Sequence, residues 1–159
     1  MRNYSSVFIG IVDILGYNSF EQTIVKYGQE SSSALIKRMF DFLDGNTSVY
    51  NENCKDVHWI RYGDGYVSYS KTNNVKNLSR MIEDASKLIA LALSSSIPLR
   101  IAITQGDIKI DVLKENGVSI TGSGWNDLRK LEKSLDWMGG WLYLPGYDGY
   151  HHSTVINLI

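Results

Sequence analysis

The sequence predicts an α+β domain in which amphipathic helices pack largely on one face of a mainly antiparallel sheet. Three observations carry this prediction. Residues 7–12 form a short apolar run typical of a buried strand, residues 59–69 form two β-prone arms around a Gly-Asp-Gly turn, and residues 76–95 carry an apolar helical stripe. The 159 residues are 43% hydrophobic, which suffices for one core, so we expect residues 1–159 to form a single domain.

Composition and charge exclude several classes of protein. The formal net charge is −1 and no cluster of Lys and Arg stands out, which argues against a broad nucleic-acid-binding surface. The single cysteine excludes a disulfide framework. The least polar later stretch, residues 88–99, is too short to span a bilayer and contains three serines. We therefore expect a soluble cytoplasmic protein that binds neither nucleic acid nor membrane.

The order of elements follows from periodicity and turn residues. The first half is expected to contain a strand at 7–12, a helix at 18–27, a helix at 31–43 that stops at Gly45-Asn46, a loop at 46–57 and the hairpin at 59–69. The second half is expected to contain a helix at 76–95, strands at 99–104 and 108–112 joined by a turn at Gly106-Asp107, a strand at 118–121, a helix at 123–137 and late strands at 141–144 and 154–158.

Two acidic residues occupy positions that suit cation binding. Asp13 ends the first strand, where a carboxylate either caps the following turn or holds a metal. Asp64 sits in the Gly-Asp-Gly turn, which is also ordinary hairpin chemistry. In a ferredoxin-like βαβ-βαβ arrangement these two places are neighbours. Together they predict a site in which two carboxylates clamp divalent cations against a nucleoside triphosphate.

The segment after Asp13 suits an anion. Gly16 permits a turn, Asn18 or Ser19 can cap the helix, and Phe20 begins its inner face. Free backbone N–H groups at a helix N-terminus, with the helix dipole behind them, favour a phosphate.

The helix at 123–137 carries a second candidate group. At 100° per residue, the leucines at 128, 131 and 135 share one side, whereas Asn126 and Lys130 lie nearly opposite. We therefore expect Asn126 and Lys130 to point away from the core of their own subunit. The alternative is an ordinary solvated helix face.

Four motifs give the chain a family resemblance: VDILGY, YGDG, LRIAITQGDI and TGSGWNDLRKLEK. Together they resemble the catalytic domain of class III nucleotidyl cyclases over nearly the whole chain. The resemblance implies a ferredoxin-like cyclase fold and two Mg²⁺ or Mn²⁺ ions held by Asp13 and Asp64, with the carbonyl of Ile14 as a further ligand. It also implies that Asn126 orients the ribose. Lys130 stands where the family has its transition-state arginine, with Arg129 one residue away.

In a nucleotidyl cyclase site, backbone N–H groups after Asp13 are expected to hold the terminal phosphates of the nucleotide. These groups belong to Gly16, Tyr17, Asn18, Ser19 and Phe20.

The purine-selecting positions of the family depart from its pattern. They are Ile60 and Ser119, which cannot supply the charged contacts that read adenine. The short single-domain build is similar to the Pycsar group of bacterial antiphage cyclases, which implies UTP or CTP as substrate. The resemblance further implies a cyclic UMP or cyclic CMP second messenger for antiviral defence, read by a separate effector protein. Tyr62 and Arg100 are candidate base contacts, although Tyr62 could simply pack and Arg100 could pair with an acid.

The outward direction of Asn126 and Lys130 predicts a head-to-tail homodimer, in which these residues complete the partner's site. Three alternatives stay open. One is an adenylate or guanylate cyclase. Another is a catalytically silent, nucleotide-binding cyclase-like domain, favoured by lysine in place of arginine. The last is a ferredoxin-like nucleic-acid-binding module, in which hairpin aromatics would stack bases: Trp59, Tyr62, Tyr66 and Tyr69.

Overall fold

The protein is represented by a computed structural model that describes residues 2–15, 30–95, 97–112, 117–134 and 139–144. The strands are β1 (Arg2–Ile14), β2 (Val57–Tyr62), β3 (Gly65–Ser70), β4 (Leu99–Val112), β5 (Val118–Thr121) and β6 (Gly139–Tyr143). The helices are α2 (Glu30–Asn53), α3 (Val75–Ser94) and α4 (Ser123–Lys133). The helix expected at 18–27 and the strand expected at 154–158 lie outside the described residues.

The strands form one sheet in the order β2-β3-β1-β4-β5, with β6 paired to β4. The neighbours in this order are antiparallel, and the β4–β6 pair is parallel. The predicted mainly antiparallel sheet is therefore confirmed. The predicted hairpin is also confirmed, since β2 and β3 pair from Val57 opposite Ser70 to Tyr62 opposite Gly65.

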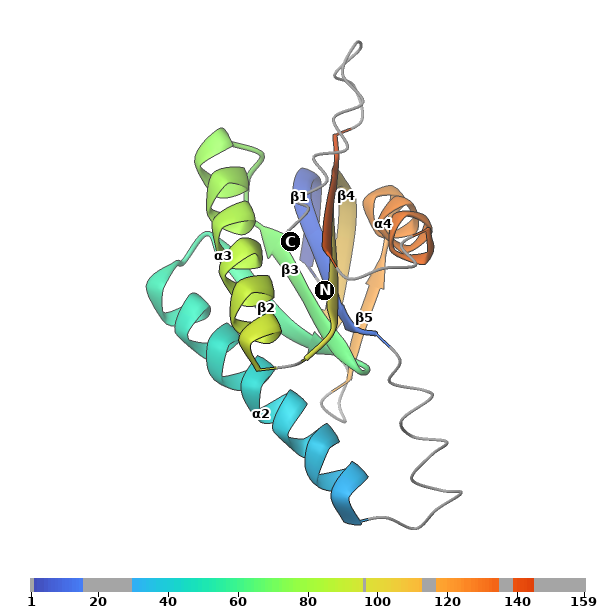
Figure 1. Cartoon of the computed structure of the whole chain (residues 1–159). Helices are drawn as coiled ribbons and strands as arrows, with labels where there is room; N and C mark the ends of the chain where they lie inside the picture. Colours follow the sequence, from blue (N-terminus) through green and yellow to red (C-terminus); the bar gives the residue numbers. More distant parts are fainter. Residues whose placement is uncertain (1, 16–29, 96, 113–116, 135–138, 145–159) are drawn as a thin grey trace.

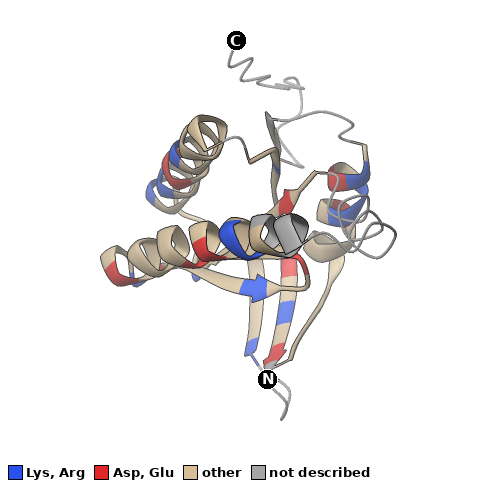
Figure 2. Ribbon diagram, turned by 60° about the horizontal axis from the view of Figure 1, so that its bottom comes forward, with Lys and Arg blue, Asp and Glu red and all other residues tan. Residues whose placement is uncertain are grey.

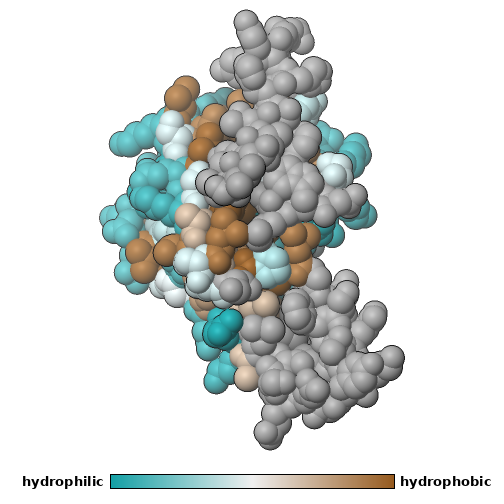
Figure 3. Space-filling model, viewed as in Figure 1, coloured by the Kyte–Doolittle hydropathy of each residue, from teal (hydrophilic) through white to brown (hydrophobic). Residues whose placement is uncertain are grey.

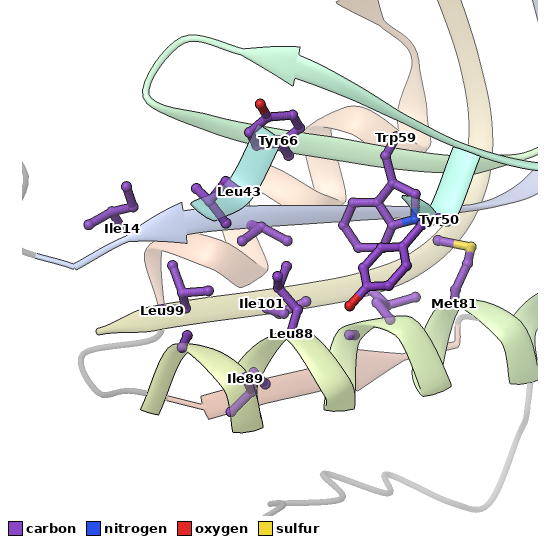
Figure 4. Close-up of a cluster of buried hydrophobic side chains, with 14 of the residues drawn as sticks. Ile14, Leu43, Tyr50, Trp59, Tyr66, Met81, Leu88, Ile89, Leu99 and Ile101 are labelled. Atoms are coloured by element: carbon purple, nitrogen blue, oxygen red, sulfur yellow. The ribbon is translucent and has the colours of Figure 1, made fainter. Parts of the chain in front are cut away.

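The helices cover both faces of the sheet, so the expectation that they pack largely on one face was wrong: β1 carries apolar residues on both of its faces. Helices α2 and α3 lie on one side and α4 on the other (Figure 1). Alternate residues of β1 serve the two cores: Phe8 and Val12 pack with α2 and α3, and Ile9 and Ile11 pack with α4. Figure 4 shows Tyr50 of α2 beside Trp59 of β2 in the first core, with their ring centroids 5.7 Å apart.

On the face of the molecule seen in Figure 3, hydrophilic residues lie along both sides and hydrophobic residues gather between them. Exposed hydrophobic side chains include Val75 and Leu91 of α3 and Tyr143 of β6. None of the helices in the described ranges is long and apolar enough to cross a membrane.

The expected stop of the second helix at Gly45-Asn46, and the loop after it, were wrong, because α2 continues to Asn53. The Asn46 amide donates to the Phe42 carbonyl at 2.8 Å, so the side chain bonds back onto the helix. One turn later the Asn51 side chain accepts from the backbone N–H of Trp59 at 2.7 Å and donates to its carbonyl at 2.8 Å. Contacts with β2 therefore outweigh the low helix propensity of Gly45, about 1 kcal/mol relative to Ala.

The expected turn at Gly106-Asp107 was also wrong, because β4 is one strand of 14 residues. Strand β1 begins at Arg2, earlier than its apolar run suggests, and its first residues, Arg2–Tyr4, pair with Ile110–Ile108 in the second half of β4. The pairing of β1 with β4 changes register between Tyr4 and Val7 of β1. Gly106 has another use: a Cβ atom on it would lie 2.5 Å from the Cα of Gly124 in α4.

Replacing Gly106 with alanine is expected to lower the free energy of unfolding by about 1–3 kcal/mol, because the added methyl group pushes α4 off the sheet. Gly45→Ala is the matched control. Gly45 has nothing within 4 Å of its added Cβ, so that variant should be more stable by roughly 0.4–1 kcal/mol. Thermal unfolding of both variants checks the prediction, and equal melting temperatures would contradict it.

His58 on β2 is expected to make stability depend on pH. Burial, followed by the charges of Lys71 and Arg2, lowers the pKa of His58 below its usual value. The unfolded chain therefore binds a proton more readily, and the free energy of unfolding should decrease as pH falls below about 6.5. His58→Phe keeps a ring against Tyr69, whose centroid is 5.3 Å away, and should flatten this dependence. Denaturant unfolding of the wild type and of His58→Phe between pH 5 and 8 measures this dependence. The same change of unfolding free energy with pH in both proteins would contradict the prediction.

Candidate active site

The turn between β2 and β3 brings the two predicted metal ligands to the same end of the sheet. Asp13 of β1 lies opposite Gly65 of β3, and Asp64 is the residue just before Gly65. A Cβ atom on Gly65 would lie 2.0 Å from the carbonyl oxygen of Val12, so glycine is needed for this close approach. Ile14 is the last residue of β1 and pairs with Leu99 of β4.

The carboxylate of Asp13 is partly buried and binds Arg100, the residue opposite it on β4. The guanidinium donates from Nε to Oδ2 at 2.8 Å, and Nη2 lies 2.7 Å from the same oxygen. Burial raises the pKa of Asp13 above its usual value, Arg100 opposes the rise, and the nearby charge of Asp64 adds to it.

Glu132 of α4 is a third acid at this place and was missed by the sequence analysis. Its side chain is 5% exposed, and its Oε1 contacts Nη2 of Arg100. Oε2 lies 3.3 Å from Nη1 of Arg129 but accepts no hydrogen bond from the described residues. The available signal was its position four residues after Leu128, which puts a carboxylate on the apolar face of the helix.

The donor set fits divalent cations that arrive with a triphosphate. Oδ1 of Asp13 and both carboxylate oxygens of Asp64 accept no hydrogen bond within the part of the chain that is described. Among these residues, no three His, Cys, Asp or Glu side chains form a group that could hold a metal ion alone. Mg²⁺ typically binds one or two carboxylates together with substrate phosphates. Residues 16–20, the expected phosphate-binding segment, lie outside the described residues.

The candidate base contacts are not all brought together within one subunit. Ile60 and Tyr62 lie on the sheet face that α4 covers, and the ring centroid of Tyr62 is 4.9 Å from that of Trp125. Arg100 is paired with carboxylates, as described above. Ser119 of β5 is opposite Asp111, eleven residues along β4 from Arg100, which is roughly 35 Å at the usual strand rise.

Helix α4 presents its polar residues as expected. Asn126 is exposed, and the Lys130 side chain is 79% exposed, with its ammonium 3.3 Å from Oδ1 of Asp127. Arg129 turns the other way, since its guanidinium lies 5.7 Å from the centre of the Trp125 ring and near Glu132. Asn126 and Lys130 thus point away from the core that contains Trp125.

The alternative of a nucleic-acid-binding hairpin is not supported by the structure. Three of its aromatic residues, Trp59, Tyr66 and Tyr69, are 3–6% exposed and belong to the cores. Stacking on bases requires exposed rings. Acidic and basic residues are interspersed on the helices and strands in Figure 2.

Solved structures of cyclase domains are similar to this chain. A dimeric guanylyl cyclase domain of the RhoGC fusion protein from Blastocladiella emersonii has a TM-score of 0.66 and 17% identity, and the match covers 89% of this chain and 80% of that one. The guanylate cyclase domain of RhGC from Catenaria anguillulae, in complex with GTP, has a TM-score of 0.64, 17% identity and the same coverage. A class III adenylyl cyclase-like ATP-binding protein from Pseudomonas aeruginosa has a TM-score of 0.65 and 15% identity, covering 89% of this chain and 33% of that one.

No model of a known protein family matches the sequence, and no curated protein sequence matches it either. At 15–17% identity the likeness to the solved structures is one of fold. The predicted fold class is confirmed: the chain has the fold of class III nucleotidyl cyclase catalytic domains.

Proposed function

We propose that the protein is a metal-dependent nucleotidyl cyclase, which converts UTP or CTP to the 3′,5′-cyclic nucleotide and pyrophosphate. The observation that carries the proposal is the placement of two carboxylates at one end of the sheet: Asp13 pairs with Gly65 of β3, and Asp64 is the turn residue just before Gly65. The fold is shared with domains that were solved with GTP and with ATPαS, which supports a nucleoside triphosphate as the ligand.

The reaction is an intramolecular displacement. The ribose 3′ oxygen bonds to the α-phosphorus, the bond from that phosphorus to the bridging oxygen of the β-phosphate breaks, pyrophosphate leaves and the hydroxyl proton goes to solvent. Asp13 and Asp64, with the carbonyl of Ile14, would hold two Mg²⁺ or Mn²⁺ ions. Bound there, such ions acidify the hydroxyl and offset charge on the α-phosphate. Asn126 orients the ribose, and Lys130 or Arg129 stabilises negative charge as it develops.

The pyrimidine preference depends on the residues at the two purine-selecting positions. Ile60 is apolar and Ser119 is uncharged, so neither offers the charged contacts expected for adenine. Tyr62, packed against Trp125, is the proposed base contact on the hairpin. By resemblance to the Pycsar group, the product would be a second messenger in antiviral defence, sensed by a separate effector protein.

The active form is proposed to be a homodimer with two composite sites. Asn126 and Lys130 are exposed on α4 and face away from their own subunit's core. A second copy related by two-fold symmetry would receive them beside its own Asp13 and Asp64. One similar domain, from Blastocladiella emersonii, is described as a non-canonical dimer in one structure and as monomeric in two others.

Incubation of the protein with each of the four nucleoside triphosphates and Mn²⁺, resolved by chromatography, tests the substrate. We expect cyclic UMP or cyclic CMP with pyrophosphate. A large excess of cyclic AMP or cyclic GMP would contradict the pyrimidine assignment while leaving a cyclase.

A second candidate, a nucleotide-binding domain without catalysis, is favoured by Lys130, since an ammonium lacks the planar fork of a guanidinium. It predicts nucleotide binding without product from any of the four substrates. In that case Lys130→Arg would be the variant that restores turnover.

A further inference from the structure

Arg100 is shared between two carboxylates that belong to different elements. Its Nη2 is 2.7 Å from Oδ2 of Asp13 in β1, and it also contacts Oε1 of Glu132 in α4. The guanidinium is a rigid fork whose N–H groups suit carboxylates, so one arginine can bind both acids at once. Arg100 thus binds one carboxylate oxygen of Asp13, a proposed metal ligand, and also contacts Glu132 of α4.

The Glu132 carboxylate is buried beside two arginines. Its side chain is 5% exposed and lies on the same helix face as Leu128, which is fully buried. A carboxylate at such a position is retained only if positive groups are next to it. Arg100 and Arg129 supply them, yet Oε2 accepts no hydrogen bond from the described residues, so Glu132 can accept more from Arg100 than it does in this structure.

A cation that binds Asp13 must compete with Arg100, because both are attracted to the same carboxylate. If Arg100 had to leave Asp13 without another acid at hand, its charge would lose a compensating partner inside a partly buried site. Glu132 provides that acid within contact distance. The arginine can therefore shift toward Glu132 without moving far, and Asp13 becomes available.

We propose that Glu132 is a positioning residue for the metal site: it holds Arg100 from the side of α4 and so frees Asp13 to bind a divalent cation. The inference depends on the proposed cyclase function, since it concerns the same metal site. It adds a link between α4, which carries Asn126 and Lys130, and the carboxylate at the end of β1.

The test is the affinity of the full chain for Mn²⁺ alone, measured by electron paramagnetic resonance. Glu132→Gln removes the charge, and Glu132→Asp keeps the charge but shortens the side chain by one methylene group, which draws the carboxylate away from Arg100. Both variants are expected to bind Mn²⁺ about tenfold more weakly, the usual effect of removing a group that orients a metal ligand. If Glu132→Asp binds as the wild type does, Glu132 acts through its charge alone or not at all, and the proposal is overturned.

The same Glu132 substitution in a variant that lacks Arg100 shows whether the effect on Mn²⁺ affinity requires Arg100. In Arg100→Gln protein there is no guanidinium to hold, so Glu132→Asp should change Mn²⁺ affinity by less than about twofold. A tenfold loss there would mean that Glu132 acts through the fold, against the proposal. Glu83→Asp, at an exposed ion pair with Lys87 on α3, is the matched control and should bind normally.

Two further measurements keep the outcomes apart. If Asp13→Asn and Asp64→Asn bind Mn²⁺ as the wild type does, the proposed metal site itself is wrong. If they lose Mn²⁺ binding while Glu132→Asp keeps it, only the role of Glu132 is wrong.

The Glu132 variants could fail to fold, which circular dichroism would show. The test is then the Nε–H resonance of Arg100 in the NMR spectrum of the wild type. This resonance should shift on addition of Mg²⁺, and an unchanged resonance overturns the proposal.

Discussion

Asp64→Ala is expected to lower the rate of cyclic nucleotide formation by at least about 10³-fold, because it removes a ligand of the cations that stabilise the transition state. The fold should survive the change. Asp64 is partly exposed in a turn, and its carboxylate forms no hydrogen bond or ion pair with the described residues. The loss should therefore appear in turnover with Mn²⁺ while the melting temperature stays near that of the wild type.

Asp56→Ala is the control for this experiment. Asp56 is exposed and lies just before the other end of the same hairpin, where its backbone carbonyl accepts the N–H of Lys71 at 2.8 Å. Truncating its side chain leaves that backbone contact in place, so the rate should stay within about twofold of the wild type, as for ordinary surface changes. Full activity of Asp64→Ala with Mn²⁺ would rule out the proposed role of this acid.

A mixture of two inactive variants is expected to recover about one quarter of the wild-type activity. Asp64→Ala damages the metal half of each composite site, and Asn126→Ala damages the half contributed by α4. After random exchange of subunits about half of the dimers are mixed, and each mixed dimer has one intact site out of two. The recovered fraction is measured as product formed per total subunit, after exchange has been verified with differently tagged chains.

The matched control is a mixture of Asp64→Ala with Asp13→Ala. Both lesions then lie in the same half of the site, so no combination of subunits contains an intact site and no activity should return. Recovery in this control, or its absence in the Asp64 and Asn126 mixture, would contradict the composite arrangement. Activity of a purified monomer would contradict it as well.

The sequence was most informative where one strong local pattern decided the structure. The Gly-Asp-Gly turn predicted the hairpin, and the stripe along residues 76–95 predicted α3 nearly to the residue. Prediction was poorer where distant contacts decided the outcome. Helix α2 runs past Gly45 because Asn51 binds the backbone of β2, and no local signal reports such a contact.

The candidate site was likewise predicted in part. Asp13 and Asp64 were identified from strand ends and turn chemistry, and their proximity depends on the register of β1 against β3. Arg100 was expected at the base or against a surface acid, whereas the structure pairs it with Asp13 itself and with Glu132. A single sequence gives strand ends but not strand register, so the pairing of Asp13 with Arg100 required the structure.

The central claim is that Asp13 and Asp64 share cations beneath a bound triphosphate. A crystal structure with Mn²⁺ and a non-hydrolysable UTP or CTP analogue, with anomalous scattering to locate the metal, tests this most directly. The account predicts manganese peaks about 2.1 Å from carboxylate oxygens of both residues and from phosphate oxygens, with Asn126 of the partner subunit at the ribose. A bound nucleotide whose manganese contacts neither acid would contradict it.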